Sequence, residues 1–403
     1  MKPARPLLAA AALALAAAVS LGLARFSYAL LLPPMRADLG WSYFTAGAMN
    51  TVNAGGYLVG ALLAPPALRR FDARTVMLVG GALAALLLLA HGAARSDSVL
   101  FLLRGLTGVA SAASFVAGGL LAARLAGAGP MRAGLVLGIY YGGVGIGIVA
   151  SALIVPGLVS GGLPGKVPAG DVAPAQWPLA WWALGAAALA ATAFTAVFTH
   201  GLAAPPLAAS QHRPFGWRQF GPALAGYTLF GLGYIGYMTF IVTLLREQGQ
   251  DAAVVTAFYA LLGAGVMASP WLWAGLLQRW HGGGPLALLN ALLALATVLP
   301  VLSAHKAVVF GSGLLFGGVI LSLVASTTAL VRHNCEAAAW PAGIAAFTVV
   351  FAAGQIVGPS VVGLIADGPG GLQRGFVLSA AVLALGALVA AAQRPLKAAA
   401  ARS

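Results

Sequence analysis

Long apolar runs alternate with short polar breaks along the whole of this chain. Each run holds about 20 or more residues rich in Ala, Leu, Val and Gly, the length that a helix needs to cross a bilayer core of roughly 30 Å. The strict polar–apolar alternation of membrane β-strands is absent from the sequence. The pattern predicts twelve membrane-spanning helices, at residues 7–33, 42–67, 75–94, 98–123, 133–158, 178–200, 219–245, 252–277, 284–303, 307–331, 342–366 and 374–393.

The composition also indicates an integral membrane protein. Of the 403 residues, 61% are hydrophobic and 7% are charged, whereas roughly 25% are charged in soluble domains. The formal net charge of +14 does not indicate a nucleic-acid partner, because the basic residues are spread over short connections and form no patch. The single cysteine, Cys335, allows neither a disulfide framework nor a multi-cysteine metal site.

The distribution of Lys and Arg predicts the orientation of the chain. If the N-terminus lies inside the cell, fourteen of these residues fall in inner segments and six in outer loops. The positive-inside rule therefore predicts that both termini are cytoplasmic. The first apolar run continues past Arg25 to Leu32, which favours an uncleaved first helix over a signal peptide.

A polar, proline-marked connection, "HGLAAPPLAASQHRPFGW", divides the predicted helices into two groups of six. An internal similarity supports a duplicated unit, because the fifth and eleventh spans coincide at an offset of 209 residues in the pairs Ala133/Ala342, Gly134/Gly343, Gly145/Gly354 and Ser151/Ser360. We expect an N-terminal bundle at 1–200, a cytoplasmic linker at 201–218 and a C-terminal bundle at 219–403.

The fourth span contains "LLRGLTGVASAA", in which Arg104, Thr107, Gly108, Ala110 and Ala112 resemble motif B of the major facilitator superfamily. The strings "ARFSYALLLPPMRADLGWS" and "GQIVGPSVVGLIAD" resemble its YbfB/YjiJ-like subgroup. The resemblance covers all twelve spans. It implies an all-α integral membrane fold of two pseudo-symmetric six-helix bundles, a bacterial inner-membrane location, a monomer, and alternating access to a central site.

The inner loops after the second and eighth spans stand where this superfamily has motif A, which contains two glycines and a carboxylate. Gly60 and Gly275 match the first glycine, but both carboxylates are missing, and Arg279 occupies one of their positions. The resemblance implies a cytoplasmic gate at Gly60, Arg69, Gly275 and Arg279, without the usual carboxylate.

Two arginines lie inside predicted spans. Arg25 is eight residues before Pro33 and Arg104 is six after Ser98, so both are expected slightly outside the midplane at a shared depth. Neither can lose its proton, and each costs about 2.5 to 3.5 kcal/mol at the bilayer centre. All eight carboxylates fall in loops or at predicted helix ends. The pair therefore favours an anionic ligand. For Arg104, a structural role in binding neighbouring helices is an equal alternative. For Arg25, a structural bond or snorkelling of the side chain to the outer surface is the less favoured alternative.

Other polar and aromatic residues in the spans fit a hydrogen-bonding chamber around these arginines. For each one alone, helix packing is the simpler interpretation, and only the set indicates a site. The predicted substrate-binding residues are Arg25, Tyr28, Asn53, Arg104, Ser111, Tyr140, Tyr234, Tyr237 and Gln355.

Several other chemistries lack support in the sequence. No Asp, Glu or His occupies the middle of a predicted span, which favours uniport or anion exchange over proton coupling. Phosphate-binding and dinucleotide fingerprints are absent, and "RHNCEAAAW" does not complete a zinc site. We therefore expect no catalytic set, no cofactor and no metal.

The sequence thus predicts a transporter for a small organic anion, a carboxylate or phosphate-like molecule, in contact with membrane lipids. Two alternatives remain open. The first is efflux of lipophilic or cationic compounds. The second is a transporter-like sensor or lipid-handling protein, which would bind a ligand without moving it.

Overall fold

The computed structural model describes residues 6–128, 133–159, 176–202 and 215–396, so most of the predicted linker lies outside the described residues. Within these ranges the regular structure is entirely helical. The membrane-length helices and their extensions are α1 (Pro6–Ala17), η1 (Ala18–Phe26), α2 (Tyr28–Leu39), α3 (Tyr43–Arg70), α4 (Ala73–Ala93), α5 (Asp97–Ala128), α6 (Ala133–Val159), α7 (Trp177–Phe198), α8 (Gly221–Glu247), α9 (Ala252–Leu272), α10 (Ala274–Arg279), α11 (Gly284–Leu302), α12 (Lys306–Asn334), α13 (Trp340–Ala366) and α14 (Gly371–Ala391); two short turns are η2 (Trp217–Phe220) and η3 (Ala337–Ala339).

The first membrane segment is a series of three helices. Between α1 and α2, residues Ala18–Phe26 form a π-helix, a wider turn that often occurs at functional sites and that contains Arg25. The predicted end of this span at residue 33 is wrong, because α2 continues through Pro33 and Pro34 to Leu39. Proline is tolerated in membrane helices where neighbouring groups satisfy the freed carbonyls. Arg25 is consequently the twentieth of the 34 residues from Pro6 to Leu39 and lies deeper than expected.

Eleven segments of the described chain are long and apolar enough to cross a membrane. The remaining predicted span corresponds to α3, which has 28 residues but is too polar to belong to that set. Its polarity comes from residues such as Asn50, Thr51 and Asn53, and α3 packs between α5 and α13. The polar helix therefore lies inside the helix assembly, where it can line a site.

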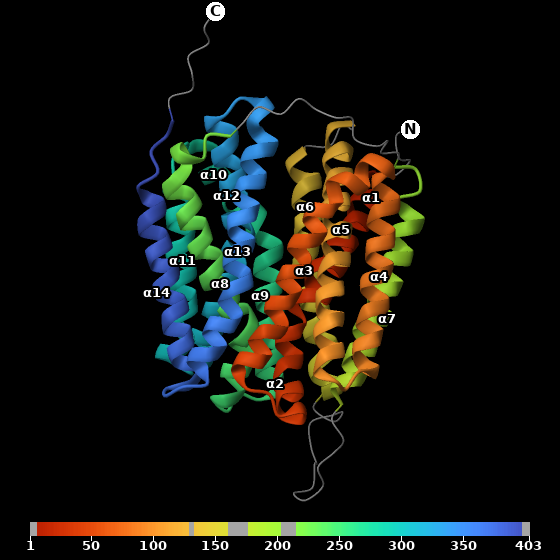
Figure 1. Ribbon diagram of the computed structural model, residues 1–403, viewed down its shortest axis with the longest axis vertical. Coiled ribbons are helices and arrows are strands. Elements are labelled where there is room, and N and C mark those ends of the chain that lie inside the picture. The colour runs from red at the N-terminus through yellow and green to blue at the C-terminus, as the bar shows by residue number, and fades with distance from the viewer. Residues whose placement is uncertain (1–5, 129–132, 160–175, 203–214, 397–403) are drawn as a thin grey trace, which may run out of the picture.

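The helices form two groups that lie side by side (Figure 1). One group contains α1–α7, with extensive packing of α3 and α4 on α5 and of α4 on α7; the other contains α8–α14, with α9 on α12 and α8 on α14. Helix α1 begins and α14 ends at the same end of the molecule, here called the proximal end, and the opposite end is called distal (Figure 1).

The two groups meet through three helix pairs, α3 with α13, α6 with α9, and α2 with α8. The ribbons of α3 and α13 approach each other at the distal end and diverge toward the proximal end (Figure 1). Glycine permits the close approach, since a Cβ at Gly363 of α13 would collide with the backbone carbonyl of Tyr43 on α3. The distal half of this seam is therefore packed backbone against backbone.

Candidate functional site

Arg25 lies at the seam between the two helix groups. Its side chain is 5% exposed, and its Nη2 donates a hydrogen bond to Oε1 of Gln355 on α13, in the opposite group. The buried Nε of Arg25 has no partner. Its Cζ lies 5.6 Å from the ring centroid of Tyr57 and 5.9 Å from that of Phe26. The guanidinium thus meets a neutral amide and aromatic rings, and its buried Nε–H remains available as a donor.

Arg104 is fully buried inside the N-terminal group. Its Nη1 donates to the carbonyl of Ala24 at 3.0 Å and its Nη2 to Oδ1 of Asn50 at 3.4 Å. Its Cζ lies 4.7 Å from the ring centroid of Tyr28, whose hydroxyl donates to the carbonyl of Ala46 at 2.9 Å. These contacts tie η1, α2, α3 and α5 together beside Arg25.

Asn53, another predicted site residue, strengthens the same arrangement. Its Nδ2 donates to the backbone carbonyl of Arg104 at 3.0 Å, while its buried Oδ1 has no partner. Asn50 reaches across the seam, since its Nδ2 donates to Oγ1 of Thr239 on α8 at 2.7 Å. Helix α3 therefore holds Arg104 on one side and contacts the C-terminal group on the other.

Further polar contacts cross the seam near Arg25. The hydroxyl of Thr51 donates to the carbonyl of Ile356 at 2.7 Å and lies 2.9 Å from Oγ of Ser360. The hydroxyl of Tyr259 on α9 donates to the carbonyl of Phe26 at 2.6 Å. Sequence reasoning missed these residues. A Thr or Tyr in an apolar helix looks the same in the sequence whether it contacts the opposite helix group or its own.

Tyr234, also a predicted site residue, belongs to a stack of aromatic rings on α8 and α13. Its ring centroid lies 4.7 Å from that of Phe230 and 5.6 Å from that of Phe351. Phe351 lies one helical turn before Gln355 on α13. The structure therefore joins Arg25 to Gln355, places Tyr234 against a ring one turn away from Gln355, and adds Tyr57, which sequence reasoning did not select.

Three other predicted site residues make their recorded contacts elsewhere. The hydroxyl of Tyr237 lies 2.7 Å from Oγ of Ser312, within the C-terminal group. Tyr140 donates to the carbonyl of Phe115 at 2.6 Å, within the N-terminal group. Ser111 is buried on α5, and its hydroxyl has no partner. None of these recorded contacts involves Arg25.

The predicted gating residues lie toward the proximal ends of α3 and of the consecutive helices α9 and α10. Gly60 lets α3 approach α5, because a Cβ there would meet the carbonyl of Val109. Gly275 has open space around it. Arg69 in the last turn of α3 and Arg279 at the end of α10 are exposed.

A cluster of contacts that sequence reasoning missed joins the two groups at the distal end. The Asp367 carboxylate, beyond the end of α13, accepts hydrogen bonds from the backbone N–H groups of Tyr43 and Phe44 at 2.7 and 2.9 Å. The hydroxyl of Tyr43 donates to Glu247, and the Cζ of Arg36 lies 3.7 Å from the Tyr43 ring centroid. This distal latch, formed by Arg36, Tyr43, Glu247 and Asp367, holds the N-terminus of α3 to the opposite group.

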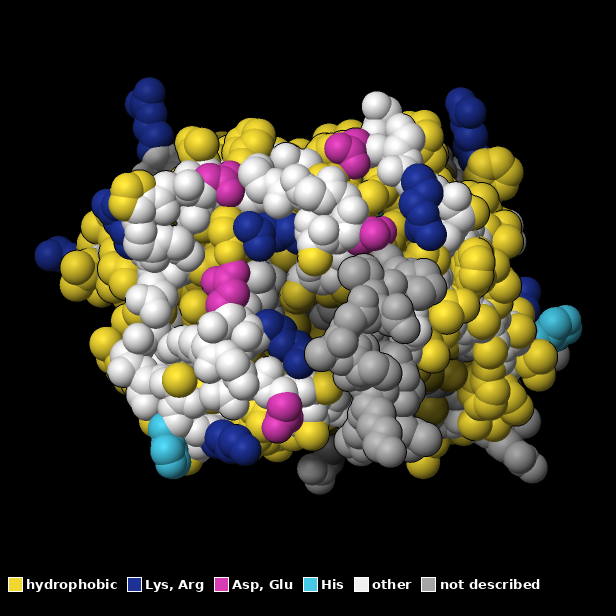
Figure 2. Space-filling model, turned by 90° about the horizontal axis from the view of Figure 1, so that it is seen from below, with side chains coloured by type: hydrophobic (Ala, Val, Ile, Leu, Met, Phe, Trp, Pro, Cys, Tyr) yellow, Lys and Arg dark blue, Asp and Glu magenta, His cyan; other side chains and the backbone are white. Residues whose placement is uncertain are grey.

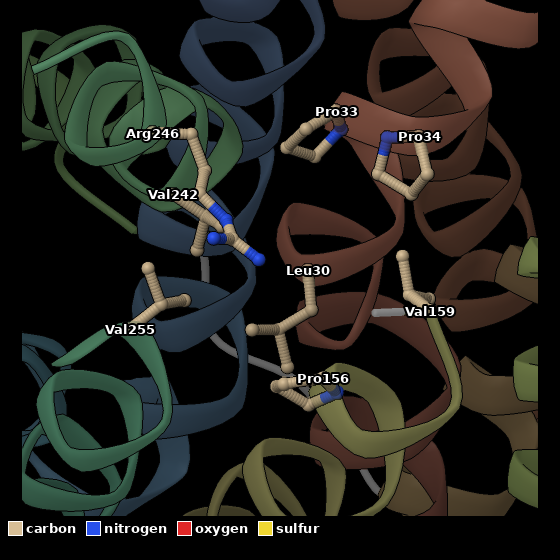
Figure 3. Close-up of a pocket in the computed structure, with 8 residues that line it drawn as sticks. All are labelled: Leu30, Pro33, Pro34, Pro156, Val159, Val242, Arg246 and Val255. Carbon is tan, nitrogen blue, oxygen red and sulfur yellow. The ribbon is translucent and has the colours of Figure 1, made fainter. Parts of the chain in front are cut away.

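Figure 2 shows the distal face, where acidic and basic side chains lie among apolar and uncharged ones. Beside the latch, a cavity of about 30 Å³ lies between α2, α6, α8 and α9 and has mainly apolar walls. Arg246 extends from α8 toward Leu30 and Pro33 across this cavity (Figure 3). The volume suits one or two water molecules rather than an organic ligand.

The sequence as a whole matches a family model described as the uncharacterised MFS-type transporter YbfB, over residues 17–391. The chain belongs to this family of major facilitator superfamily transporters. Its members are transporters and not enzymes, so the conclusion agrees with the expectation from the sequence. No curated protein is similar enough to match the chain.

Solved structures of the same superfamily share its fold. A bacterial homologue of the human lysosomal transporter Spinster, inward-facing and unoccupied, is 15% identical with a TM-score of 0.70, over 96% of this chain and 97% of that one. The nucleoside transporter NupG is 14% identical with a TM-score of 0.70, over 95% and 98%. The human organic anion transporter MFSD10 is 14% identical with a TM-score of 0.65, over 96% and 99%. The facilitator fold predicted from the sequence is thus confirmed.

Titratable side chains in the described part of this facilitator form no group of three or more that could hold a metal ion. The rings of His281 and His333 lie 4.4 Å apart near the proximal end, and Nε2 of His333 is 3.0 Å from the carbonyl of Leu277. Burial raises the pKa of the neighbouring Cys335 thiol. At the "RHNCEAAAW" segment, the described side chains therefore make packing contacts and form no metal centre.

Proposed function

We propose that this facilitator moves a small organic anion across the bacterial inner membrane, by uniport or exchange, and that Arg25 is the anchor for the anion. One observation carries the proposal. The Arg25 guanidinium is buried at the seam between the helix groups, its recorded hydrogen bond goes to the neutral amide of Gln355, and its Nε has no partner.

The buried charge of Arg25 carries an energetic cost that a ligand can offset. A permanent cation in the membrane interior costs about 2.5 to 3.5 kcal/mol on insertion scales, and its arrangement is retained where it serves a function. A carboxylate or phosphate oxygen that accepts from Nε and Nη offsets this cost through charge-assisted, two-point hydrogen bonds. The contacts recorded for Arg25 include no carboxylate of the described chain, so an anionic ligand is the counter-charge that fits.

Arg104 has a different role in this proposal. Its buried Nε also has no partner, but its hydrogen bonds go to helix backbone and to Asn50 within the N-terminal group, and Tyr28 covers its face. We assign it to positioning, because it fixes the residue next to Arg25 relative to α3 and α5.

Transport requires that the site open to each side of the membrane in turn, by rocking of two bundles at residues 1–200 and 219–403. The distal latch closes one side in this conformation. We place the proximal end, with both termini, in the cytoplasm, because the Lys and Arg excess of the sequence falls on that side. The conformation then corresponds to the inward-facing stage, and we take the working unit to be a monomer.

The similar structures do not choose the substrate. They include a transporter described as carrying organic anions and another described as carrying nucleosides, and at 15% identity or less they show the fold alone. The assignment of an anion therefore depends on Arg25 and its surroundings.

Two experiments test the proposal. Thermal unfolding of the purified protein is measured with small carboxylates, phosphates, amines and neutral solutes; a ligand at ~100 times its dissociation constant adds about 2.7 kcal/mol. The stabilising solutes are then tested for flux into proteoliposomes. We expect carboxylates or phosphates to stabilise the protein and to cross.

The matched variants are Arg25→Gln, which removes the charge and keeps an amide, and Arg70→Gln at the exposed end of α3. Loss of charge-assisted bonds worth about 1.5 to 3 kcal/mol predicts anion binding at least ~10-fold weaker in the first variant and unchanged in the second. Anion binding that persists in a folded Arg25→Gln protein contradicts the proposal. Stabilisation only by lipophilic amines favours efflux of cations, and binding without flux favours a sensor or lipid-handling protein.

A further inference from the structure

We propose that the anion bound at Arg25 is a planar aromatic carboxylate. This inference rests on the proposed function, because it assumes that Arg25 binds an anion and concerns the part of the ligand beyond its carboxylate. The inference is based on aromatic rings that lie beside the guanidinium in the N-terminal group and beside its partner Gln355 in the C-terminal group.

Rings approach Arg25 from both groups. Tyr57 of α3 and Phe26 of η1 lie with their ring centroids 5.6 and 5.9 Å from the guanidinium carbon. From the opposite group, Gln355 accepts from Nη2 of Arg25, and Phe351, one turn before Gln355 on α13, stacks with Tyr234 at 5.6 Å between ring centroids. A ligand whose carboxylate binds Nε of Arg25 therefore has aromatic neighbours on two sides.

The rings of the C-terminal group form a nearly parallel stack. Phe351 is tilted by 12° from Phe230 and by 18° from Tyr234, with centroids 5.1 and 5.6 Å apart. Tyr227 continues the stack toward the proximal end, 5.0 Å from Phe351 and tilted by 25°. A further aromatic ring can pack against the end of such a stack, because offset stacking of two rings is a favourable geometry.

Two of these rings, those of Tyr57 and Phe351, are only partly buried. The aromatic surface near Arg25 is therefore not fully used up in packing.

The recognition follows from the two parts of the ligand. Its carboxylate lies in the plane of an attached aromatic ring and binds the planar guanidinium edge, and the ring then contacts the faces of Tyr57, Tyr234 and Phe351. An aliphatic carboxylate binds the guanidinium in the same way but lacks a ring that could stack on these aromatic faces. Aromatic contacts contribute beyond the burial of area, so the ring is expected to raise affinity at equal charge.

The test compares benzoate with cyclohexanecarboxylate, which matches it in charge and nearly in size but has no π face. Their dissociation constants are measured by isothermal titration calorimetry on the full-length purified protein. We expect benzoate to bind about fivefold tighter or more, the effect of one or two ring contacts. Phe351→Leu is expected to bring the two constants close together. Phe194→Leu, which removes a ring of the α7 pair Phe194 and Phe198, is the matched control and should keep the ratio.

The outcomes separate the two proposals. Equal binding of the two carboxylates to the wild-type protein overturns the aromatic inference and leaves the anion site in place. An unchanged ratio in folded Phe351→Leu overturns the assignment to this stack. If phosphate binds and neither carboxylate does, the aromatic inference fails. If amines bind and neither carboxylate does, the anion site fails as well. The wild-type comparison needs no variant, so a variant that does not fold leaves the test decisive.

Discussion

Neutralising Asp367 should release the distal end of α3 and shift the protein toward a conformation that is open on that side. The two carboxylate oxygens accept from the first two backbone N–H groups of α3, at 2.7 and 2.9 Å. Ser42 satisfies the next free N–H, that of Thr45, at 3.1 Å. The helix start is therefore capped partly from its own chain segment and partly from the opposite helix group.

The magnitude follows from the change in charge. Asp367→Asn keeps the shape, but its single amide oxygen can retain only one of the two hydrogen bonds, as a neutral one, because the amide nitrogen donates and cannot accept. It also removes an anion from a helix N-terminus, which alone is worth about 0.3 to 1 kcal/mol. Together these terms amount to about 1 to 2 kcal/mol in favour of the closed distal side. The ratio of distal-open to distal-closed molecules should therefore rise roughly 5- to 30-fold, and less at high salt because the group is exposed.

The assay is the rate at which a membrane-impermeant maleimide labels a single cysteine at Leu30, which lines the distal cavity and is 5% exposed. The native Cys335 is replaced by Ala in this background. The control is Asp251→Asn, because Asp251 caps α9 within its own group by accepting from the backbone N–H of Val254 at 2.8 Å. We expect faster labelling in Asp367→Asn only. Equal rates in both variants and the parent would refute the reasoning that Asp367 holds the distal side closed.

Three further outcomes are expected. Arg104→Ala should lower the melting temperature, because it leaves buried carbonyls without donors at a cost of about 1 to 3 kcal/mol each; circular dichroism on heating checks this. Gly363→Ala should destabilise the protein or speed distal labelling, since its Cβ has no room, whereas Gly55→Ala, with nothing within 4 Å, should not. Partial burial opposes ionisation of Asp72, but hydrogen bonds from the α4 N-terminus lower its pKa below the ordinary 3.8. Asp72→Ala should therefore cost about 1 kcal/mol at neutral pH, and this difference should fade only as the pH falls below that value.

The hydropathy pattern predicted the helices well because membrane-spanning length is a strong local signal. The one predicted span that is less apolar, α3, is also the helix that packs between α5 and α13. The π-helix around Arg25 was not predictable, because no local sequence signal marks its wider turn; in the structure η1 lies close to α6 at Gly22 and Gly147.

The site was predicted best where a strongly polar side chain stood out in an apolar run. Arg25 stood out as a cation in an apolar run, and Gln355 as an amide in another, and the structure joins them. Tyr57 and Tyr237 are indistinguishable by sequence, yet one lies over Arg25 and the other hydrogen-bonds Ser312. Asp367 was interpreted as a helix-end residue, since its partner is 324 positions away in the chain.

The most direct test of the anion site at Arg25 is to place a carboxylate beside it within the protein. Gln355→Glu gives the guanidinium a permanent partner at the position of the present amide. Thermal stabilisation by carboxylates and by lipophilic amines is then compared between this variant and the wild type. The account predicts that carboxylates stabilise the wild type and lose at least ~10-fold in affinity in Gln355→Glu. Undiminished stabilisation by carboxylates, or a preference of the wild type for amines, would contradict it.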